Sequence, residues 1–155
     1  MTPELDDFDR RILDFVQIDC RQPAETIGAA IGLSASAVQR RLARLRQSGV
    51  IIGDISLVDP KAAERPLTLI VNIELERERP ELLHSFRAWI AQEPAIQQAW
   101  YVTGDGDYVL IITARDVEAY DDLMQRLTAE NSNVRRFHTR VALGTLKRGL
   151  ALPMD

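Results

Sequence analysis

The sequence predicts an α+β protein built from two modules. Residues 1–53 of the 155-residue chain show apolar residues at helical spacing and the layout of a helix-turn-helix. From residue 67 the pattern changes to strands and helices in the order β-α-β-β-α-β, which is the ferredoxin-like arrangement. We therefore expect a helix-turn-helix module over 1–53, a linker over 54–66 and a second module over 67–155.

Charge is divided between the two modules. The whole chain has a formal net charge of −4 at pH 7. Residues 10–53 contain seven Arg and three acidic residues, whereas residues 54–155 contain 12 Lys and Arg against 16 Asp and Glu. A basic module joined to an acidic one favours a polyanionic partner for the first module.

Composition excludes several classes of protein. Hydrophobic residues make up 46% and charged residues 27% of the chain, as in ordinary folded proteins. No apolar run approaches the roughly 18 residues of a membrane span, and the acidic start "MTPELDDFD" is unlike a signal peptide. Cys20, His84 and His138 are too far apart to form a metal-ligand pattern, and no catalytic triad or carboxylate pair stands out. We expect a cytoplasmic protein without a metal, a cofactor or catalytic residues.

Three helices are predicted in the first module. Apolar residues at helical spacing predict a helix over 6–20. Pro23 is well placed at the start of a second helix, and Gly32 suits the left-handed position that ends it. Ser34 or Ser36 can cap the third helix. That helix is expected over 35–47, with Val38, Leu42 and Leu45 as its buried stripe.

The third helix is rich in arginine. Residues 32–51, "GLSASAVQRRLARLRQSGVI", hold four Arg and no acidic residue. Arginines without local partners repel one another, and DNA phosphates would relieve that repulsion. The second helix of a helix-turn-helix enters the major groove, where Arg, Gln and Ser contact bases and phosphates. The alternative is a solvated basic helix in a three-helix core. The candidate DNA-binding residues are Ser34, Ser36, Gln39, Arg40, Arg41 and Arg44.

The segment after the third helix has two parts. Residues 50–59, "VIIGDISLVD", predict a short strand pair that turns at Gly53-Asp54. The stretch from Asp59 to Pro66 contains two prolines and mixed charge, which is typical of a linker.

The second module alternates strands and helices. Strands are predicted in "LTLIVNIELE", "IQQAWYVT", "YVLIIT" and "VRRFHTRVALG", and helices over 80–92 and 117–129. Two helices cover only one face of a four-stranded sheet. The other face would expose an apolar surface, which predicts pairing with another subunit.

The loop "TGDGDY", residues 103–108, joins the two central strands. Asp-Gly pairs favour a hairpin turn. A Ca²⁺ loop would need further oxygen ligands that are absent at the required spacing. A third interpretation is a site for an amino acid, in which backbone N–H groups bind the carboxylate and Asp105 or Asp107 binds the ammonium group.

Together these stretches resemble the Lrp/AsnC family of regulators over nearly the whole chain. The matching segments are "DDFDRRIL", "ETIGAAIGLSASAVQRRLARLRQSGVIIG", "LVDP", "AWYVTGDGDYVL" and "FHTRVALGTLKRGLALP". The resemblance implies a sequence-specific transcriptional regulator with an N-terminal winged helix-turn-helix and a βαββαβ ligand-binding domain. It also implies dimers that pair through the C-terminal sheets, often assemble into tetramers or octamers on double-stranded DNA, and respond to an amino acid or related metabolite.

The resemblance also implies where an effector binds, namely near the loop after the second strand, at contacts between dimers. Arg140 adds a charge beside this site, which favours a polar or acidic ligand over leucine. The chain has Ser132-Asn133-Val134 where the family usually has Pro-Gly-Val, and Asn133 can adopt the left-handed conformation of Gly. The implied effector residues are Tyr101, Thr103, Gly104, Asp105, Asp107 and Tyr108, with Arg140 and Val141 nearby.

Two alternatives belong to other classes of protein. Some Lrp-like proteins are sirohaem decarboxylases, and Arg136 with His138 on one face of the last strand is compatible with such an enzyme. An amino-acid sensor that has lost DNA binding is the other alternative. The arginine-rich third helix favours the regulator over both.

Overall fold

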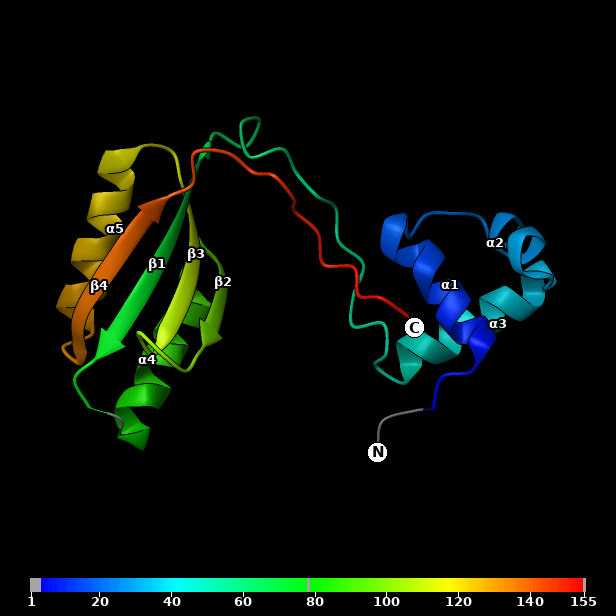
Figure 1. Cartoon of the computed structure of the whole chain (residues 1–155), viewed down its shortest axis with the longest axis horizontal. Coiled ribbons are helices and arrows are strands. Elements are labelled where there is room, and N and C mark those ends of the chain that lie inside the picture. The colour runs from blue at the N-terminus through cyan, green and yellow to red at the C-terminus, as the bar shows by residue number, and fades with distance from the viewer. Residues whose placement is uncertain (1–3, 78, 155) are drawn as a thin grey trace. The chain divides into compact units, whose positions relative to one another are not determined.

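The computed structural model describes residues 4–77 and 79–154, and its chain forms two compact units. The first unit contains the chain up to Leu57 together with the tail from Lys147, and the second runs over Val58–Leu146 (Figure 1). Within these described parts, no helix is long and apolar enough to cross a membrane.

The first unit is a bundle of three helices, as predicted. They are α1 (Asp7–Ile18), α2 (Ala24–Ile31) and α3 (Ala35–Gln47). Their apolar stripes meet in one core, and each fully buried side chain contributes about 1.5–3 kcal/mol to stability. The core residues are Ile12, Leu13, Ile27, Ile31, Val38 and Leu45.

The turn between α2 and α3 depends on a close approach of two backbone segments. Gly32 has φ +79°, the left-handed conformation predicted for it. The N–H groups of Gly32 and Leu33 both donate to the carbonyl of Gly28, each at a distance of 2.9 Å. Ser34 then caps α3 by accepting a hydrogen bond from the Ala37 N–H at 3.2 Å. A Cβ added to Gly28 would lie 2.4 Å from the carbonyl oxygen of Leu33, so only glycine fits there.

The predicted strand pair over 50–59 is wrong. Residues 52–59 form neither a strand nor a turn, so the described chain does not build a wing from this segment. Its apolar side chains are exposed, with Ile52 at 96% and Leu57 at 71%. The pattern is suited to a strand, but a strand needs a neighbour to receive its backbone hydrogen bonds.

The C-terminal tail, which we expected in the second module, belongs to the first unit. The Gln17 side chain donates to the carbonyl of Leu152 (3.0 Å) and accepts from its N–H (2.7 Å). Met154 packs against the core of the helix bundle. These contacts connect the end of the chain to α1.

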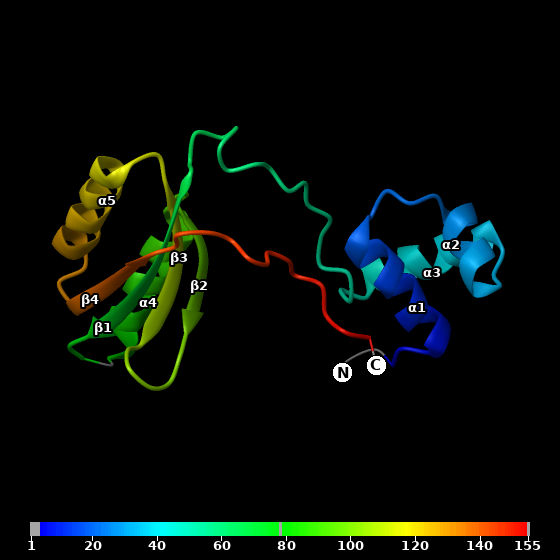
Figure 2. The same ribbon diagram turned by 45° about the horizontal axis from the view of Figure 1, so that its top comes forward.

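The second unit is a four-stranded antiparallel sheet with two helices on one face (Figures 1 and 2). The strand order is β2-β3-β1-β4, and the order of elements along the chain confirms the predicted β-α-β-β-α-β arrangement. The elements are β1 (Leu67–Leu75), α4 (Pro80–Gln92), β2 (Ile96–Tyr101), β3 (Tyr108–Ala114), α5 (Val117–Glu130) and β4 (Val134–Val141).

Strand β1 alternates between two faces with different roles. Leu69, Val71 and Ile73 are at most 2% exposed and pack against Phe86 of α4 and Leu127 of α5. The residues between them, such as Asn72, lie on the open face and stay partly exposed. This period of two separates the core from the surface that could bind a ligand or a partner.

Asn133 holds the start of β4 by a different means from the one expected. It lacks a positive φ, and the non-glycine residue of the described chain that has one is Glu64. The side-chain amide of Asn133 instead donates to the Arg77 carbonyl (2.8 Å) and accepts from the Arg77 N–H (3.0 Å). Asn133 is 8% exposed, and its amide extends the pairing of β1 with β4 beyond the bulge in β1.

Replacing Gly28 by alanine tests the tight turn of the helix-turn-helix. Gly→Ala within a helix ordinarily stabilises by about 0.5–1 kcal/mol. Here the crowding against Leu33 reverses the sign, and G28A should lower the free energy of unfolding by about 1–3 kcal/mol in denaturant titrations followed by circular dichroism. Gly53→Ala is the control, because a Cβ there meets no atom within 4 Å. A G28A protein as stable as wild type would contradict this account.

Candidate DNA-binding helix and effector site

Helix α3 presents most of the predicted DNA-binding residues to solvent. Ser34, Ser36, Gln39, Arg40 and Arg44 are all exposed. Arg41 differs from them, since its side chain is only 22% exposed. The helix therefore offers a polar surface from which Arg41 is partly withdrawn.

Arg41 and Arg44 have acidic partners on α1, which corrects the prediction of arginines without partners. One nitrogen of Arg41, Nη1, donates to Asp6 (2.7 Å) and to Asp9 (2.8 Å). Arg44 donates to the other carboxylate oxygen of Asp9. The side chain of Asp9 is 1% exposed, so this carboxylate is buried and paired with two guanidinium groups.

Asp6 and Asp9 also form the cap of α1. Asp6 accepts from the Asp9 N–H at 2.8 Å, and Asp9 accepts from the Asp6 N–H at 3.3 Å. The hydrogen bond from the Asp9 backbone, followed by the one from the Arg41 side chain, lowers the pKa of Asp6 below its ordinary value. The sequence contained one signal for these ion pairs. Asp6 and Asp9 are three positions apart at the start of one helix, and Arg41 and Arg44 are three positions apart on another.

The remaining two arginines of α3 also differ from each other. Arg46 pairs with Asp54 at 3.1 Å, and both side chains are 41% exposed, so water and salt weaken this pair. The Arg40 side chain has no acidic or hydrogen-bonding partner in the parts of the chain that the structure describes. Arg40 is thus the arginine of α3 with the fewest competing contacts.

The loop over 103–107 is a hairpin turn fixed to β1 by Asp107. The Asp107 carboxylate accepts from the Leu75 N–H (2.6 Å), and its own N–H donates to the Ile73 carbonyl (2.8 Å). Gly104 and Gly106 have φ of +110° and +120°, and the Gly106 N–H donates to the Gly104 carbonyl at 3.0 Å. The Gly106 N–H, one of the backbone N–H groups that could receive a ligand carboxylate, is therefore bonded within the loop in this structure.

The two predicted effector tyrosines lie on the helix-covered face. Tyr108 is 3% exposed and packs edge-on against Phe86. Arg87 of α4, which the sequence analysis missed, donates from Nε to the Tyr108 hydroxyl at 3.0 Å and lies 5.4 Å from the centre of the Tyr101 ring. Val141 pairs with Leu69 in the sheet register and therefore belongs to this face as well.

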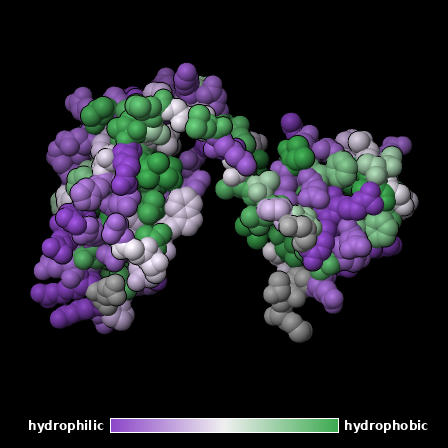
Figure 3. Space-filling view, in the orientation of Figure 1, coloured by the Kyte–Doolittle hydropathy of each residue, from purple (hydrophilic) through white to green (hydrophobic). Residues whose placement is uncertain are grey.

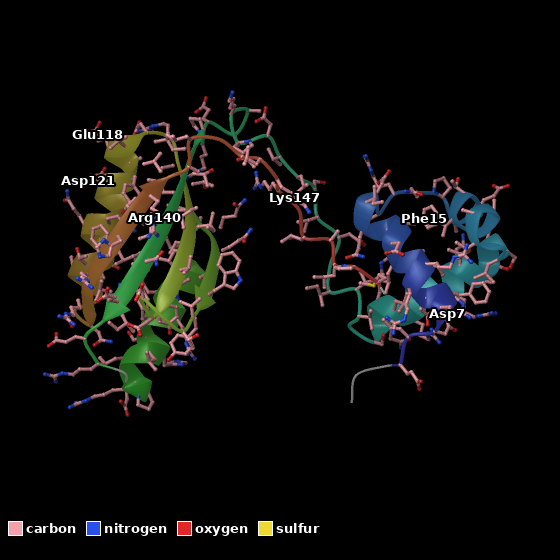
Figure 4. The ribbon with its side chains drawn as sticks, in the orientation of Figure 1. Asp7, Phe15, Glu118, Asp121, Arg140 and Lys147 are labelled. Atoms are coloured by element: carbon pink, nitrogen blue, oxygen red, sulfur yellow. The ribbon has the colours of Figure 1, made fainter. Side chains whose placement is uncertain are left out.

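Asp105 and Arg140 instead line one hollow of about 300 Å³ on the open face. Arg140 lies on β4 (Figure 4) and donates to Asn72 at 3.3 Å, while Asn72 donates to the Asp105 carbonyl at 3.4 Å. The structure thus joins these two of the predicted effector residues and separates them from the tyrosines. The lining residues are Asn72, Glu74, Asp105, Arg136, His138 and Arg140.

The hollow has mixed charge. Arg136 pairs with Glu74 at 2.7 Å, and this contact lowers the pKa of the Glu74 carboxyl. Figure 3 shows hydrophilic and hydrophobic residues side by side on the sheet unit. The open face is therefore only partly apolar, which corrects the expectation of an apolar surface. Asn72 and Glu74 were missed, although their positions between buried residues of β1 marked them as outward-facing.

Comparisons with known proteins agree with both units. Residues 5–46 match the model of the AsnC-type helix-turn-helix domain, and residues 68–152 match that of the Lrp/AsnC ligand binding domain. The helix-turn-helix-type transcriptional regulator y4tD of Sinorhizobium fredii is 41% identical over 98% of this chain and 90% of its own.

Two solved structures share the fold. The AsnC family transcriptional regulator from Agrobacterium tumefaciens has a TM-score of 0.92 and 28% identity, covering 97% of this chain and 98% of its own. A transcriptional regulator of Neisseria meningitidis, described as a complex with L-Met, has a TM-score of 0.91 and 22% identity over 98% of each chain, a likeness of fold. These matches define a helix-turn-helix transcriptional regulator with a ligand-binding domain. The chain belongs to the Lrp/AsnC family.

Proposed function

We propose that the chain regulates transcription by placing α3 in the major groove of its operator. The observation that supports this most directly is the exposed polar row at α3, in which Arg40 has no partner among the described residues and Ser34, Ser36 and Gln39 offer further polar groups. Bidentate contacts of Arg to guanine and contacts of Ser to phosphate are the chemistry such a row supplies.

The enzyme and DNA-free sensor alternatives have less support. Arg136 and His138 do lie on one face of β4, but Arg136 is already bonded to Glu74. The relatives are named as transcriptional regulators rather than enzymes. Since its proposed partner is chromosomal DNA, we place the protein in the cytoplasm and assign it no catalytic role.

We further propose that the protein acts as a dimer or a higher assembly. The open sheet face carries Trp100, 47% exposed and opposite Val109 in the strand register, and Ile111 two positions further along β3. The apolar segment around Ile52 and Leu57 is also exposed. A second copy would remove both surfaces from water, and two-fold symmetry would place two α3 helices on successive major grooves.

An amino acid or a related small metabolite is the proposed effector. Arg140 offers a guanidinium group to a carboxylate, and Asp105 offers a carboxylate to an ammonium group, in one hollow. The Neisseria regulator described with L-Met supports an effector of this class. Arg136 is paired with Glu74, whereas the guanidinium group of Arg140 is bonded to the neutral amide of Asn72, so Arg140 is the charge that favours a ligand with a polar or acidic side chain.

Arg40→Ala tests the recognition role of α3. The variant should bind operator DNA more weakly by about 1–3 kcal/mol if Arg40 contacts a base edge, as measured by fluorescence anisotropy at fixed salt. Arg21→Ala is a matched control, because Arg21 is an exposed arginine of the same unit that lies outside α3. Equal affinities of R40A and wild type would remove Arg40 from recognition.

Sedimentation tests the assembly. The wild type at micromolar concentration should behave as at least twice the chain mass of 17.5 kDa. Ile111→Lys should shift it toward the single chain, because an ammonium group would have to be buried in the interface. Gln125→Lys, on the outer side of α5, should change nothing. A wild type that sediments as a single chain would contradict the proposal.

Arg140→Ala tests the effector site. A thermal-shift screen of the twenty amino acids should identify ligands that raise the unfolding midpoint of the wild type. The variant should bind such a ligand more weakly by about 1.5–3 kcal/mol, the usual worth of a hydrogen bond to a charged group. Arg115→Ala is the control, since Arg115 pairs with Asp116 before α5 and does not line the hollow. An undiminished shift in R140A would exclude the hollow as the site.

A further inference from the structure

Arg41 and Arg44 of α3 are bound to different extents where α3 packs against α1. We name Asp6 and Asp9, with the guanidinium groups of Arg41 and Arg44 that they hold, the acidic clamp. Arg41 makes three hydrogen bonds to the two carboxylates, whereas Arg44 makes one. The guanidinium of Arg41 also lies 5.5 Å from the centre of the Phe8 ring. Arg41 is therefore enclosed, and Arg44 is tethered at one point.

Exposure follows the same division. The Arg44 side chain is 56% exposed and that of Arg41 is 22% exposed. A phosphate can approach the free N–H groups of Arg44 without breaking its bond to Asp9. To reach Arg41, it would have to replace carboxylates that are already in place. Salt screens this partly buried contact less than it screens exposed charges, so the competition persists at physiological salt.

Sequence-independent binding to DNA depends on how many phosphates the protein neutralises. If every arginine of α3 were available, binding to random DNA would be strong and its discrimination poor. Internal carboxylates that occupy some arginines reduce this non-specific contribution. Contacts from exposed residues such as Arg40 to base edges are left unchanged, so the ratio of specific to non-specific affinity rises.

We propose that the acidic clamp limits the binding of α3 to DNA phosphates, by withholding Arg41 and orienting Arg44, and that Asp6 is therefore a specificity-determining residue. This inference rests on the proposed binding of DNA by α3. Asp6 does not touch DNA in this scheme and acts through Arg41. The ligand concerned is the phosphate backbone of duplex DNA of any sequence.

Asp6→Asn weakens the clamp while sparing the fold, because it removes one of the two carboxylates that Arg41 contacts and leaves Asp9 in place. Asn caps a helix about as well as Asp, so the cap of α1 is retained while one negative charge is lost. Asp7→Asn is the matched control, because Asp7 is the next residue at the start of α1 (Figure 4) and contacts neither arginine. Both variants remove the same charge from the same region. The difference in DNA affinity between the two variants therefore reports the release of Arg41, because both variants lose the same repulsion between a carboxylate and the DNA.

The measurement is the affinity of full-length protein for a random-sequence duplex over a series of salt concentrations. D6N should bind more tightly than D7N, and the slope of log K against log [salt] should steepen by about 0.9 if Arg41 gains one phosphate contact. Adding Arg41→Gln to D6N should return the slope to that of the wild type. Arg41→Gln alone should leave the slope unchanged, because Arg41 is withheld in the wild type.

The outcomes separate the two proposals. Equal affinities and slopes for D6N and D7N would overturn the inference alone, as would a shallower slope for Arg41→Gln in the otherwise wild-type protein. A wild type that binds no duplex at any salt concentration would overturn the proposed function and the inference with it. Thermal unfolding of each variant checks that the change in binding does not come from loss of the fold.

Discussion

The buried carboxylate of Asp9 is the constraint on which the DNA-binding unit depends. An ionised group that is 1% exposed must be paired, because an unpaired buried charge costs several kcal/mol. Two guanidinium groups of α3 provide that pairing, so α1 and α3 are held at a defined distance and rotation. These ion pairs thereby determine which face of α3 is exposed to solvent, with Arg40 pointing outward and Arg41 inward. The proposed recognition surface of α3 and the stability of the bundle thus both depend on one acidic side chain of a neighbouring helix.

The alternation of side chains along the strands gives the sheet of the second unit two different faces. One set of β1 residues forms the core with α4 and α5, and the other set lines the open face. The apolar part of that face suits a second subunit, and the hollow at Asp105 and Arg140 suits a small zwitterionic ligand. A ligand in the hollow would change the assembly only if it bound one assembly state more tightly than another. No separate moving part is required for such coupling.

Two of the predicted site residues make contacts that stabilise the fold. Asp105 or Asp107 is predicted to bind an ammonium group, and of these two the Asp107 carboxylate accepts from the Leu75 N–H and fixes the hairpin to β1. Tyr108 was expected in the effector site, but it is buried against Phe86 and bonded to Arg87. The same loop still supplies Asp105 to the hollow. A motif can therefore be recognised correctly while the tasks of its members are divided between the fold and the site.

The sequence by itself determined the elements and their order. Apolar spacing gave all three helices of the first unit and the β-α-β-β-α-β order of the second, and Gly32 and Ser34 marked the turn and the cap before α3. These signals are local, since each depends on residues within a few positions. Only the tertiary structure decided that Arg41 meets Asp6, that Asp105 shares a hollow with Arg140, and that residues 52–59 have no strand partner within the described chain. Arg41 and Asp6 lie 35 positions apart in the sequence, and Arg140 and Asn72 lie 68 apart. Periodicity carries no information about which distant charges packing will bring together.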